Sequence, residues 1–270
     1  MDLVVIGAGR AGGSLARAAT AAGHRVVGML TRRPQHDHPA LDWDEPLPGC
    51  DLVLVAVSDG AITDVAERLA PRWNPETPAV HVSGFMPVSA LAPIAARGAA
   101  VGSVHPLQTL PDPERGAAAL AGAGGAVTAA EPLVGLLDEL ARSLGMRPFA
   151  LADEAKPLYH AAAAAAANYV VEALGVASDL LAAAGVDMAV MEPLTRRVVE
   201  NVFAVGAAAA PRGPTCGSRT SGSSSLKRIA RPSNPRSRSR RMAVLAKEGE
   251  TKSASAACTS GQKASGRVTA

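Results

Sequence analysis

Hydrophobic and polar positions follow two alternating patterns along the first 150 residues. Short apolar runs rich in β-branched residues are typical of buried parallel strands, because they are too short for helices. Helical patterns occupy the intervals between these runs, and the alternation predicts an α/β fold with a doubly wound parallel sheet. We expect strands at 2–6, 24–30, 51–57, 79–83, 100–104, 126–129 and 147–151, and helices at 13–22, 61–69 and 131–144.

After residue 150 the pattern becomes that of one long helix. Asp153 is placed to cap its start, and Gly185 supplies a C-cap about thirty residues later. A further helix is expected between Met188 and Ala210. A helix this long and alanine-rich needs other helices or a second subunit beside it, so we expect a homodimer formed through this region. The expected domains are an α/β domain at 1–150, a helical domain at 151–210 and a tail at 211–270.

A glycine-rich turn follows the first expected strand. It consists of Gly7, Ala8, Gly9, Arg10, Ala11 and Gly12. Gly7 permits a tight turn, Gly9 lets the backbone approach a pyrophosphate, and Gly12 allows the next helix to pack closely on the strand. That helix presents free N–H groups and the positive end of its dipole to an anion. Strand, glycines, helix and second strand in this order predict a dinucleotide-binding domain of Rossmann type; the alternative is a glycine-rich turn that binds nothing.

The end of the second strand selects the dinucleotide. NAD sites usually hold Asp or Glu there for the ribose hydroxyls, but this chain has Thr31, Arg32 and Arg33. Two guanidinium groups and a hydroxyl suit a 2′-phosphate, so we predict NADP as the cofactor. An arginine pair on a solvated loop is the alternative. Val57 and Ser58, at the end of the third strand, are expected to contact the same cofactor.

Polar residues follow the later strands, where the carboxyl ends of a parallel sheet meet the ligand crevice. Ser83 and Gly84 end the fourth strand, and His105 begins a His-Pro turn that leads to Gln108 and Thr109. We expect Ser83, His105, Gln108 and Thr109, together with His81, to line the half of the cleft that holds the nicotinamide, with Ser83 and His105 taking part in catalysis. Gly84 is expected in the substrate pocket with Gln108 and Thr109. His105 also fits a rigid turn, because a residue before proline is restricted to extended conformations.

Lys156 is the single lysine among the first 210 residues, against 13 arginines. Arginine stays charged, whereas a partly buried lysine can exchange a proton because burial lowers its pKa. His160 lies one turn further on the same helix face, so both side chains can approach one substrate carbonyl. Asn168 is about 12 Å further along the helix from His160, so it cannot share one small substrate atom with Lys156 and is expected to be a packing or pocket-wall residue. The alternative is a helix-surface lysine beside a packed histidine.

Composition narrows the remaining possibilities. The three cysteines, Cys50, Cys216 and Cys258, have no metal-ligand spacing and suggest no disulfide framework, so we expect a cytoplasmic protein without a metal. We see no apolar run of membrane-spanning length and expect no membrane partner. The chain enters its first strand directly, which leaves no room for a signal peptide.

Residues 211–270 differ from the rest of the chain in charge. Residues 1–210 carry 14 Lys and Arg against 22 Asp and Glu, whereas 211–270 carry 13 against 2 together with 12 serines. This composition predicts a disordered basic tail. Such a tail can contact nucleic acid phosphates, but without aromatic residues for stacking we expect no specific nucleic acid partner. We interpret the abrupt change as a shifted reading frame after about Ala210, which would truncate the helical domain.

Six stretches of the chain carry a resemblance to a known family: GAGRAGGSLA, DLVLVAVSDGAI, HVSG, VGSVHPLQTLPDP, KPLYHAAAAAAANYVVEAL and AGVD. Residues 1 to about 209 resemble a bacterial family of the 6-phosphogluconate dehydrogenase-like superfamily, in which a Rossmann-like domain precedes a helical domain of unknown function of the DUF2520 type. Hydroxyacid enzymes of the superfamily place a catalytic lysine where Lys156 stands, with asparagine at the position of His160. The resemblance also implies that His105 and Ser83 lie near the nicotinamide, as in prephenate dehydrogenases.

These observations converge on one functional hypothesis and one alternative. The chain is expected to be an NADP-dependent oxidoreductase that transfers a hydride between the nicotinamide and a small oxo or hydroxy acid. Lys156 would protonate the developing alkoxide with help from His160, while Ser83, His105 and Gln108 would hold the carboxylate or carbonyl. The alternative is an NADP-binding sensor or subunit without turnover, which needs no proton donor.

Overall fold

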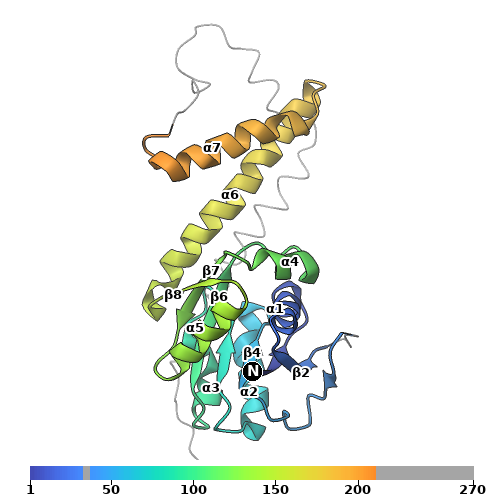
Figure 1. Ribbon diagram of the computed structural model, residues 1–270, viewed down its shortest axis with the longest axis vertical. Helices are drawn as coiled ribbons and strands as arrows, with labels where there is room; N and C mark the ends of the chain where they lie inside the picture. The colour runs from blue at the N-terminus through green and yellow to red at the C-terminus, as the bar shows by residue number, and fades with distance from the viewer. Residues whose placement is uncertain (33–36, 211–270) are drawn as a thin grey trace, which may run out of the picture. The chain divides into compact units, whose positions relative to one another are not determined.

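The computed structural model describes residues 1–32 and 37–210, and within them the strands form one eight-stranded sheet (Figure 1). The strands are β1 Asp2–Ile6, β2 Arg25–Leu30, β3 Ala40–Leu41, β4 Leu52–Val55, β5 Ala79–His81, β6 Val101–Leu107, β7 Gly124–Thr128 and β8 Arg147–Ala150. Their order across the sheet is β3-β2-β1-β4-β5-β6-β7-β8. Successive strands therefore add outward from β1 in both directions, which confirms the doubly wound sheet.

The sheet is parallel from β3 to β6 and reverses at β7. Val104 of β6 lies opposite Val127 of β7 in antiparallel register, whereas β7 and β8 are again parallel to each other. The predicted parallel sheet is therefore confirmed from β3 to β6, whereas β7 and β8 run in the opposite direction. The spacing of apolar residues marks a buried strand but does not encode its direction, and mixed sheets with such edges are common.

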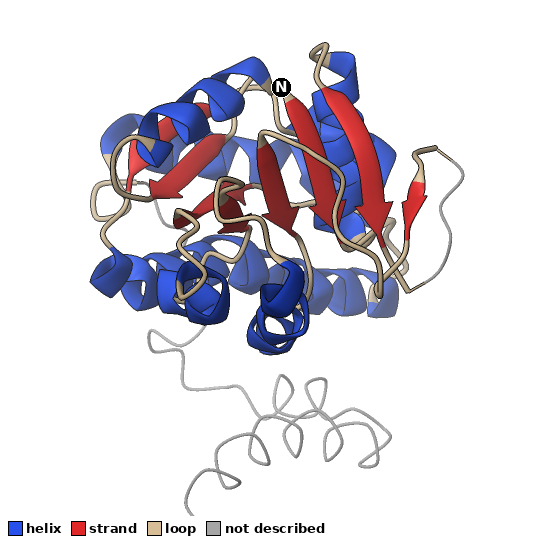
Figure 2. Cartoon of the chain, turned by 90° about the horizontal axis from the view of Figure 1, so that it is seen from below, coloured by secondary structure: helices blue, strands red, loops and turns tan. Residues whose placement is uncertain are grey.

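Helices cover both faces of the sheet (Figure 2). The α-helices are α1 Arg10–Ala21, α2 Ile62–Leu69, α3 Ala92–Ala95, α4 Pro113–Ala119, α5 Leu133–Ser143, α6 Lys156–Ala183 and α7 Glu192–Val205. Short 3₁₀ segments are η1 Asp59–Ala61, η2 Ala70–Arg72, η3 Val88–Leu91, η4 Asp153–Ala155 and η5 Met188–Met191. Neither β3 nor α4 was predicted, because both lie in segments whose prolines and polar residues indicate loops.

Two buried clusters hold these layers together. On one face, Leu15 of α1 and Leu137 of α5 pack on the sheet, and on the other face Ile62 of α2 and Ile94 of α3 do so. All four side chains are almost completely buried. The sheet thus has an apolar core on each side, and the polar carboxyl ends of its strands remain available for a ligand.

The chain forms two compact units, Met1–Val190 and a second that begins at Met191. The first unit contains the sheet and helices α1 to α6. The described part of the second unit covers residues 191–210 and contains α7. Arg33 and the tail 211–270, on which several sequence predictions fall, lie outside the described residues.

The long helix α6 leaves many apolar side chains exposed. Leu158 is 79% exposed, Tyr169 73% and Val171 68%. By length and composition alone, the segment Asp153–Ala183 could cross a membrane, with a hydropathy of 1.3. The expectation that no run reaches membrane-spanning length is therefore corrected. A run dominated by alanine is only mildly apolar, and the same exposed surface fits a helix that packs against another protein.

Candidate active site

The glycine turn between β1 and α1 has the shape expected for a phosphate-binding loop. Gly7 adopts a positive φ of 99°, and a Cβ there would lie 2.4 Å from the carbonyl oxygen of Ala56. A Cβ on Gly12 would lie 2.0 Å from the carbonyl oxygen of Gly7, whereas a Cβ on Gly9 would meet nothing within 4 Å. Gly7 and Gly12 thus pack the turn against β4 and α1, and Gly9 keeps an open space above it.

No side chain of the described residues caps the N-terminus of α1. Gly9 is its N-cap residue and has no side chain to offer, so the backbone N–H groups of Arg10 and Ala11 keep their capacity to bind an anion. Arg10 and Ala11 line one cavity beside the loop, and Ala8 lines another; Gly9 lines both. The open space over Gly9 and the uncapped amides therefore fit a pyrophosphate.

A cavity of about 350 Å³ lies on the β2 side of the loop. Its wall brings together four of the residues predicted to bind the cofactor, Thr31 and Arg32 at the end of β2 and Val57 and Ser58 after β4. The exposed Arg32 side chain makes no hydrogen bond or ion pair with the described residues, and no acidic residue is among the described residues that line the cavity. A guanidinium without a carboxylate partner suits a phosphate more than a ribose diol.

Trp43 also lines this cavity, although the sequence reasoning missed it. Its indole Nε1 donates a hydrogen bond to the Thr31 carbonyl at 3.3 Å, and the Arg68 guanidinium lies 4.8 Å from the ring centre. The side chain comes from the polar, proline-containing loop after β3. One of only two tryptophans in the chain, in an otherwise polar loop after the second strand, was the signal that could have found it.

A larger cavity, of about 640 Å³, lies on the other side of the glycine loop. It extends from Gly9 and Arg10 to the predicted residues His105, Gln108 and Thr109 at the end of β6. The Gln108 amide is turned toward the protein, because it donates to the Ala119 carbonyl at 3.2 Å and accepts from the Thr109 N–H at 2.8 Å. The two cavities share the residues Gly9, Ala56, Val57 and Ser58. They therefore lie on the two sides of the glycine turn and adjoin each other.

His105 is held in a defined orientation at the end of this cavity. Its Nδ1 lies 2.8 Å from the hydroxyl of Tyr159 on α6, and the two rings meet edge to face at 88°. A Cβ on Gly84 would lie 2.7 Å from the His105 ring, so Gly84 lets the ring lie directly on the backbone. Burial lowers the pKa of His105 to about 4, with repulsion from His160 as a further cause. The imidazole is therefore neutral at pH 7.

Tyr159 is a second residue that the sequence reasoning missed. Burial raises the pKa of its phenol to about 12, so the hydroxyl keeps its proton at neutral pH. Tyr159 also packs against Phe149, with ring centres 6.1 Å apart. It stands directly before His160 in the stretch KPLYH, and helical spacing alone would have placed it a quarter of a turn away from His160. Nothing in that spacing pointed to a residue of β6.

Ser83 shapes the turn beneath the cavity. It is buried, and its hydroxyl accepts hydrogen bonds from the N–H groups of Phe85 at 3.1 Å and Met86 at 3.0 Å. Its own N–H donates to Nδ1 of His81, whose Nε2 is 3.2 Å from the Pro87 carbonyl. These contacts hold Gly84 under the His105 ring. A direct contact between Ser83 and a substrate stays a prediction.

Lys156 is buried, and its ammonium group is bound by two groups of the protein. The residue is 1% exposed, and its Nζ lies 2.9 Å from Asp153 Oδ1 and donates to the Met86 carbonyl at 3.0 Å. Asp153 in turn accepts from the Val88 N–H at 3.0 Å. This network ties the start of α6 to the turn after β5. The arrangement favours an anchoring role for Lys156 over the direct protonation that the sequence suggested.

His160 and Lys156 do not share one environment. His160 is exposed, and its ring lies 5.4 Å from that of Phe85, whereas Lys156 is buried. We expected the two side chains to approach one substrate carbonyl. The geometry does not favour this, because the buried lysine turns inward to Asp153. Asn168 is exposed on α6 and is not among the residues that line the two cavities of the loop.

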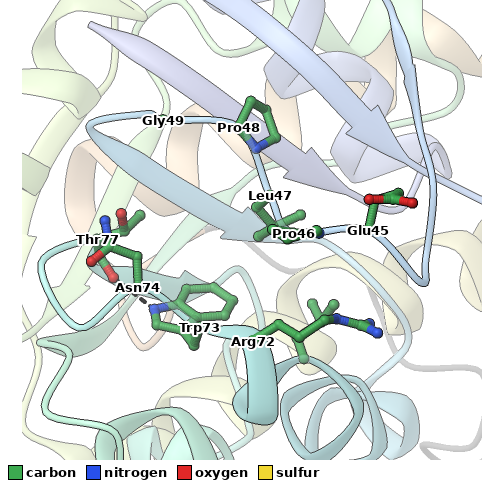
Figure 3. Close-up of a pocket in the computed structure, with 10 residues that line it drawn as sticks. Glu45, Pro46, Leu47, Pro48, Gly49, Arg72, Trp73, Asn74 and Thr77 are labelled. Carbon is green, nitrogen blue, oxygen red and sulfur yellow. Dashed lines mark hydrogen bonds between the residues drawn. The ribbon is translucent and has the colours of Figure 1, made fainter.

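A third cavity, of about 180 Å³, lies at the other edge of the sheet, among the segments that precede β4 and β5 (Figure 3). Its wall includes Leu47, Pro48 and Trp73, and the Trp73 Nε1 donates to the Thr77 carbonyl at 2.8 Å. None of the residues predicted for the site lies there. The chemistry of the chain is thus concentrated at the carboxyl edge, as expected for this architecture.

Two family models match successive parts of the chain. A Rossmann-like domain matches residues 1–106, and the domain of unknown function DUF2520 matches residues 125–216. His105 is therefore in the first match, and Tyr159 and Lys156 are in the second. No curated protein matches the chain.

Several solved structures share the fold. A protein of Bacteroides fragilis, named as a candidate NADP oxidoreductase, has a TM-score of 0.69 at 22% identity, over 79% of this chain and 84% of its own. Protein TM1727 of Thermotoga maritima has 0.59 at 20%, over 78% and 83%. Pyrroline carboxylate reductase of Plasmodium falciparum, with NADP bound, has 0.58 at 13%, over 75% and 79%. This chain has the same fold and carries the architecture of the family that its sequence resembles, a Rossmann-like domain followed by DUF2520.

Proposed function

We propose that the protein is an NADP-dependent oxidoreductase that acts on a small oxo or hydroxy acid. The observation that carries this proposal is the continuity of the site: an uncapped helix N-terminus and open glycine turn lie between two cavities, one reaching Arg32 and the other His105. The neighbours named as an NADP oxidoreductase and as a reductase with NADP bound support the same class. When bound, the nicotinamide supplies or accepts the hydride.

The residues of the smaller cavity support NADP as the cofactor. Arg32 offers a guanidinium to a 2′-phosphate, and Thr31 lies beside it at the end of β2. Trp43 gives the cavity an aromatic wall on which an adenine ring can pack. The backbone amides of Arg10 and Ala11 would hold the pyrophosphate at the start of α1.

The residues of the larger cavity support proton transfer to a substrate oxygen. His105 is neutral, ordered by Tyr159 and present in the cavity wall, so it can exchange a proton with a carbonyl or hydroxyl group. Thr109 and Arg10 line the same cavity and offer polar groups to a substrate carboxylate. Lys156 would act indirectly. Its ion pair with Asp153 positions the start of α6, and therefore Tyr159.

A calorimetric titration tests the cofactor assignment directly. We expect NADPH to bind at least tenfold more tightly than NADH, because a charge-assisted hydrogen bond contributes about 1.5–3 kcal/mol. Arg32→Ala should remove most of this preference and leave the affinity for NADH nearly unchanged. Arg97→Ala, a matched change at an exposed position before β6, should change neither affinity. Equal affinity of the unmodified protein for both dinucleotides would contradict the assignment.

Turnover separates the enzyme from a dinucleotide-binding sensor. NADPH oxidation should be followed with a panel of small 2-oxo acids, and in the opposite direction NADP reduction with 2- and 3-hydroxy acids. An enzyme needs a proton donor at the reacting atom, so His105→Gln should abolish turnover while NADPH still binds. Tight NADPH binding without turnover on the whole panel would favour the sensor.

We also propose that a second copy of the chain covers α6. The helix exposes Leu158, Tyr169 and Val171, and its alanine run at 161–167 has side chains small enough for a second helix to approach closely. A surface of this kind is unfavourable in water unless another apolar surface covers it. A homodimer formed through the helical region satisfies this requirement.

A further inference from the structure

The His105–Tyr159 pair joins two segments that are distant in the sequence. His105 is in β6 and Tyr159 is in the first turn of α6, and their side chains meet through Nδ1 and the phenolic oxygen at 2.8 Å. The edge-to-face ring contact at 5.6 Å and the packing of Tyr159 against the Phe149 ring restrict both side chains. The hydrogen bond is therefore part of a packed arrangement rather than a chance surface contact.

The opposite nitrogen of the imidazole is left for a ligand. Nδ1 is taken by Tyr159, the ring lies against Gly84, and Nε2 has no hydrogen-bond partner among the described residues. His105 lines the larger cavity, so Nε2 is the polar atom that this ring can offer there. A ring nitrogen in the wall of an open cavity, without a partner among the described residues, can bind a substrate oxygen.

We propose that Tyr159 is a positioning residue that donates its hydroxyl proton to Nδ1 of His105, and so fixes on Nε2 the hydrogen that the site delivers to a substrate carbonyl oxygen. This inference rests on the proposed oxidoreductase function and deepens it in two ways. It adds a second member to the proton-transfer machinery, and it limits the substrate class. A carbonyl oxygen accepts a hydrogen bond from Nε2–H, whereas an iminium nitrogen carries its own N–H and would meet it donor to donor.

The protons balance through the pair. As reduced nicotinamide dinucleotide reduces the carbonyl carbon, the substrate oxygen takes the Nε2 proton and a new O–H bond forms. Nδ1 takes the proton of the Tyr159 hydroxyl, so the imidazole ends neutral with its proton on the other nitrogen. Nε2 then takes a proton from solvent that enters the cavity, as Nδ1 returns its proton to the Tyr159 phenolate, which restores the starting pair. One hydride and one proton are consumed per turnover, and the reverse sequence serves hydroxyl oxidation.

The charges around His105 favour the neutral ring in this exchange. His160 and Lys156 disfavour a positive charge on it, whereas Asp59 favours one. Among these groups Lys156 is already paired with Asp153, and Asp59 makes no hydrogen bond or ion pair with the ring in the described part of the chain. The proton that a neutral imidazole can donate to a substrate thus depends on which ring nitrogen carries its single hydrogen. The hydrogen bond from Tyr159 determines that nitrogen.

Nitrogen NMR of the ligand-free protein tests the positioning role without cofactor or substrate. In protein with ¹⁵N-labelled histidine, the His105 signals, identified by their loss in His105→Gln, should show Nε2 protonated and Nδ1 unprotonated at pH 7. Tyr159→Phe should weaken this preference, because Nδ1 loses its donor while the ring packing remains. Tyr169→Phe, which removes the hydroxyl of the other tyrosine in the chain at an exposed site on the same helix, should change nothing. A proton on Nδ1 in the unmodified protein, or an unchanged preference in Tyr159→Phe, would overturn the proposal.

Kinetics tests the substrate class and separates this inference from the proposed function. Small 2-oxo acids should be reduced, and cyclic imine acids of the same size should not. Tyr159→Phe should lower kcat by at least tenfold with a much smaller change in KM, and Tyr169→Phe should leave both unchanged. Preferential reduction of imines would overturn the carbonyl assignment. Turnover of neither class would count against the proposed function, and the NMR result would then still decide whether Tyr159 fixes the His105 proton.

Discussion

At the residue scale, His105 and Lys156, the two residues that the sequence suggested for proton transfer, lie in different environments. His105 lines the larger cavity, whereas the single lysine of the described residues is enclosed by Asp153 and the Met86 carbonyl. Chemistry and spacing singled out both residues correctly as unusual. Which of them faces the cavity depends on side-chain direction across two elements, and a linear pattern does not contain that information.

Removing the buried ammonium should destabilise the protein more than it affects cofactor binding. Lys156→Met leaves the Asp153 carboxylate and the Met86 carbonyl without their charged partner, at a cost of about 1–3 kcal/mol in the free energy of unfolding. Urea denaturation measures this change, and NADPH titration of the folded variant should give nearly the same affinity as before. Arg142→Met breaks an exposed pair with Asp138 and should cost less than about 1 kcal/mol. Equal effects of the two variants would refute the anchoring role.

The neutral histidines make stability depend on pH. Burial lowers the pKa of His81 to about 4, against an ordinary value of 6.5, so the unfolded chain binds protons that the folded chain does not. The free energy of unfolding should therefore be at its full value above pH 6.5 and fall as the pH is lowered toward 4. Urea denaturation at several pH values measures this slope. His81→Gln should reduce the slope by about one proton, and an unchanged slope would refute the assignment.

At the scale of elements, the glycine turn offers two substitutions of the same size with different expected outcomes. Gly9→Ala meets nothing within 4 Å, so the protein should fold with nearly unchanged stability but lose NADPH affinity by at least tenfold, because the methyl group occupies the open space. Gly12→Ala would place Cβ 2.0 Å from the Gly7 carbonyl oxygen and should destabilise the fold itself. Thermal unfolding and calorimetric titration distinguish the two effects.

A third glycine provides the matched control. Gly135 lies inside α5, and a Cβ there also meets nothing within 4 Å. Gly135→Ala should raise the free energy of unfolding by about 0.5–1 kcal/mol, because alanine is the better helix former, and should leave NADPH binding unchanged. Loss of affinity in this variant as well would show that the titration reports general damage and not the loop.

The elements themselves were largely predictable from the sequence, and their exceptions have physical reasons. The apolar runs at 2–6 and 51–57 correspond to the strands β1 and β4, the second of which is shorter than expected, and the expected helix at 131–144 corresponds to α5. The reversed direction of β7 was missed, because burial on both faces gives parallel and antiparallel strands the same apolar pattern. The partnership of Tyr159 and His105 was missed for a similar reason, since it depends on how α6 approaches β6 and not on the period of either element.

At the scale of the whole molecule, the exposed face of α6 should control association. The unmodified protein should sediment as a dimer at micromolar concentration, and Val171→Arg should shift it to a monomer, because a charge then lies in the apolar contact. Glu67→Arg, which places an arginine on the exposed surface of α2, should leave the mass unchanged. A monomer that floats with lipid vesicles would contradict the dimer and favour a membrane as the partner.

The hydrogen bond between His105 and Tyr159 also bears on how this architecture can be rearranged. The histidine belongs to the segment matched by the Rossmann-like domain and the tyrosine to the segment matched by DUF2520. Neither segment alone holds the complete pair, so a chimera that combines one half with a foreign partner would lose the bond unless the donor and acceptor were exchanged together. Selection would then act on the two halves as a unit. In related sequences, a substitution at position 105 should be accompanied by a compensating substitution at position 159.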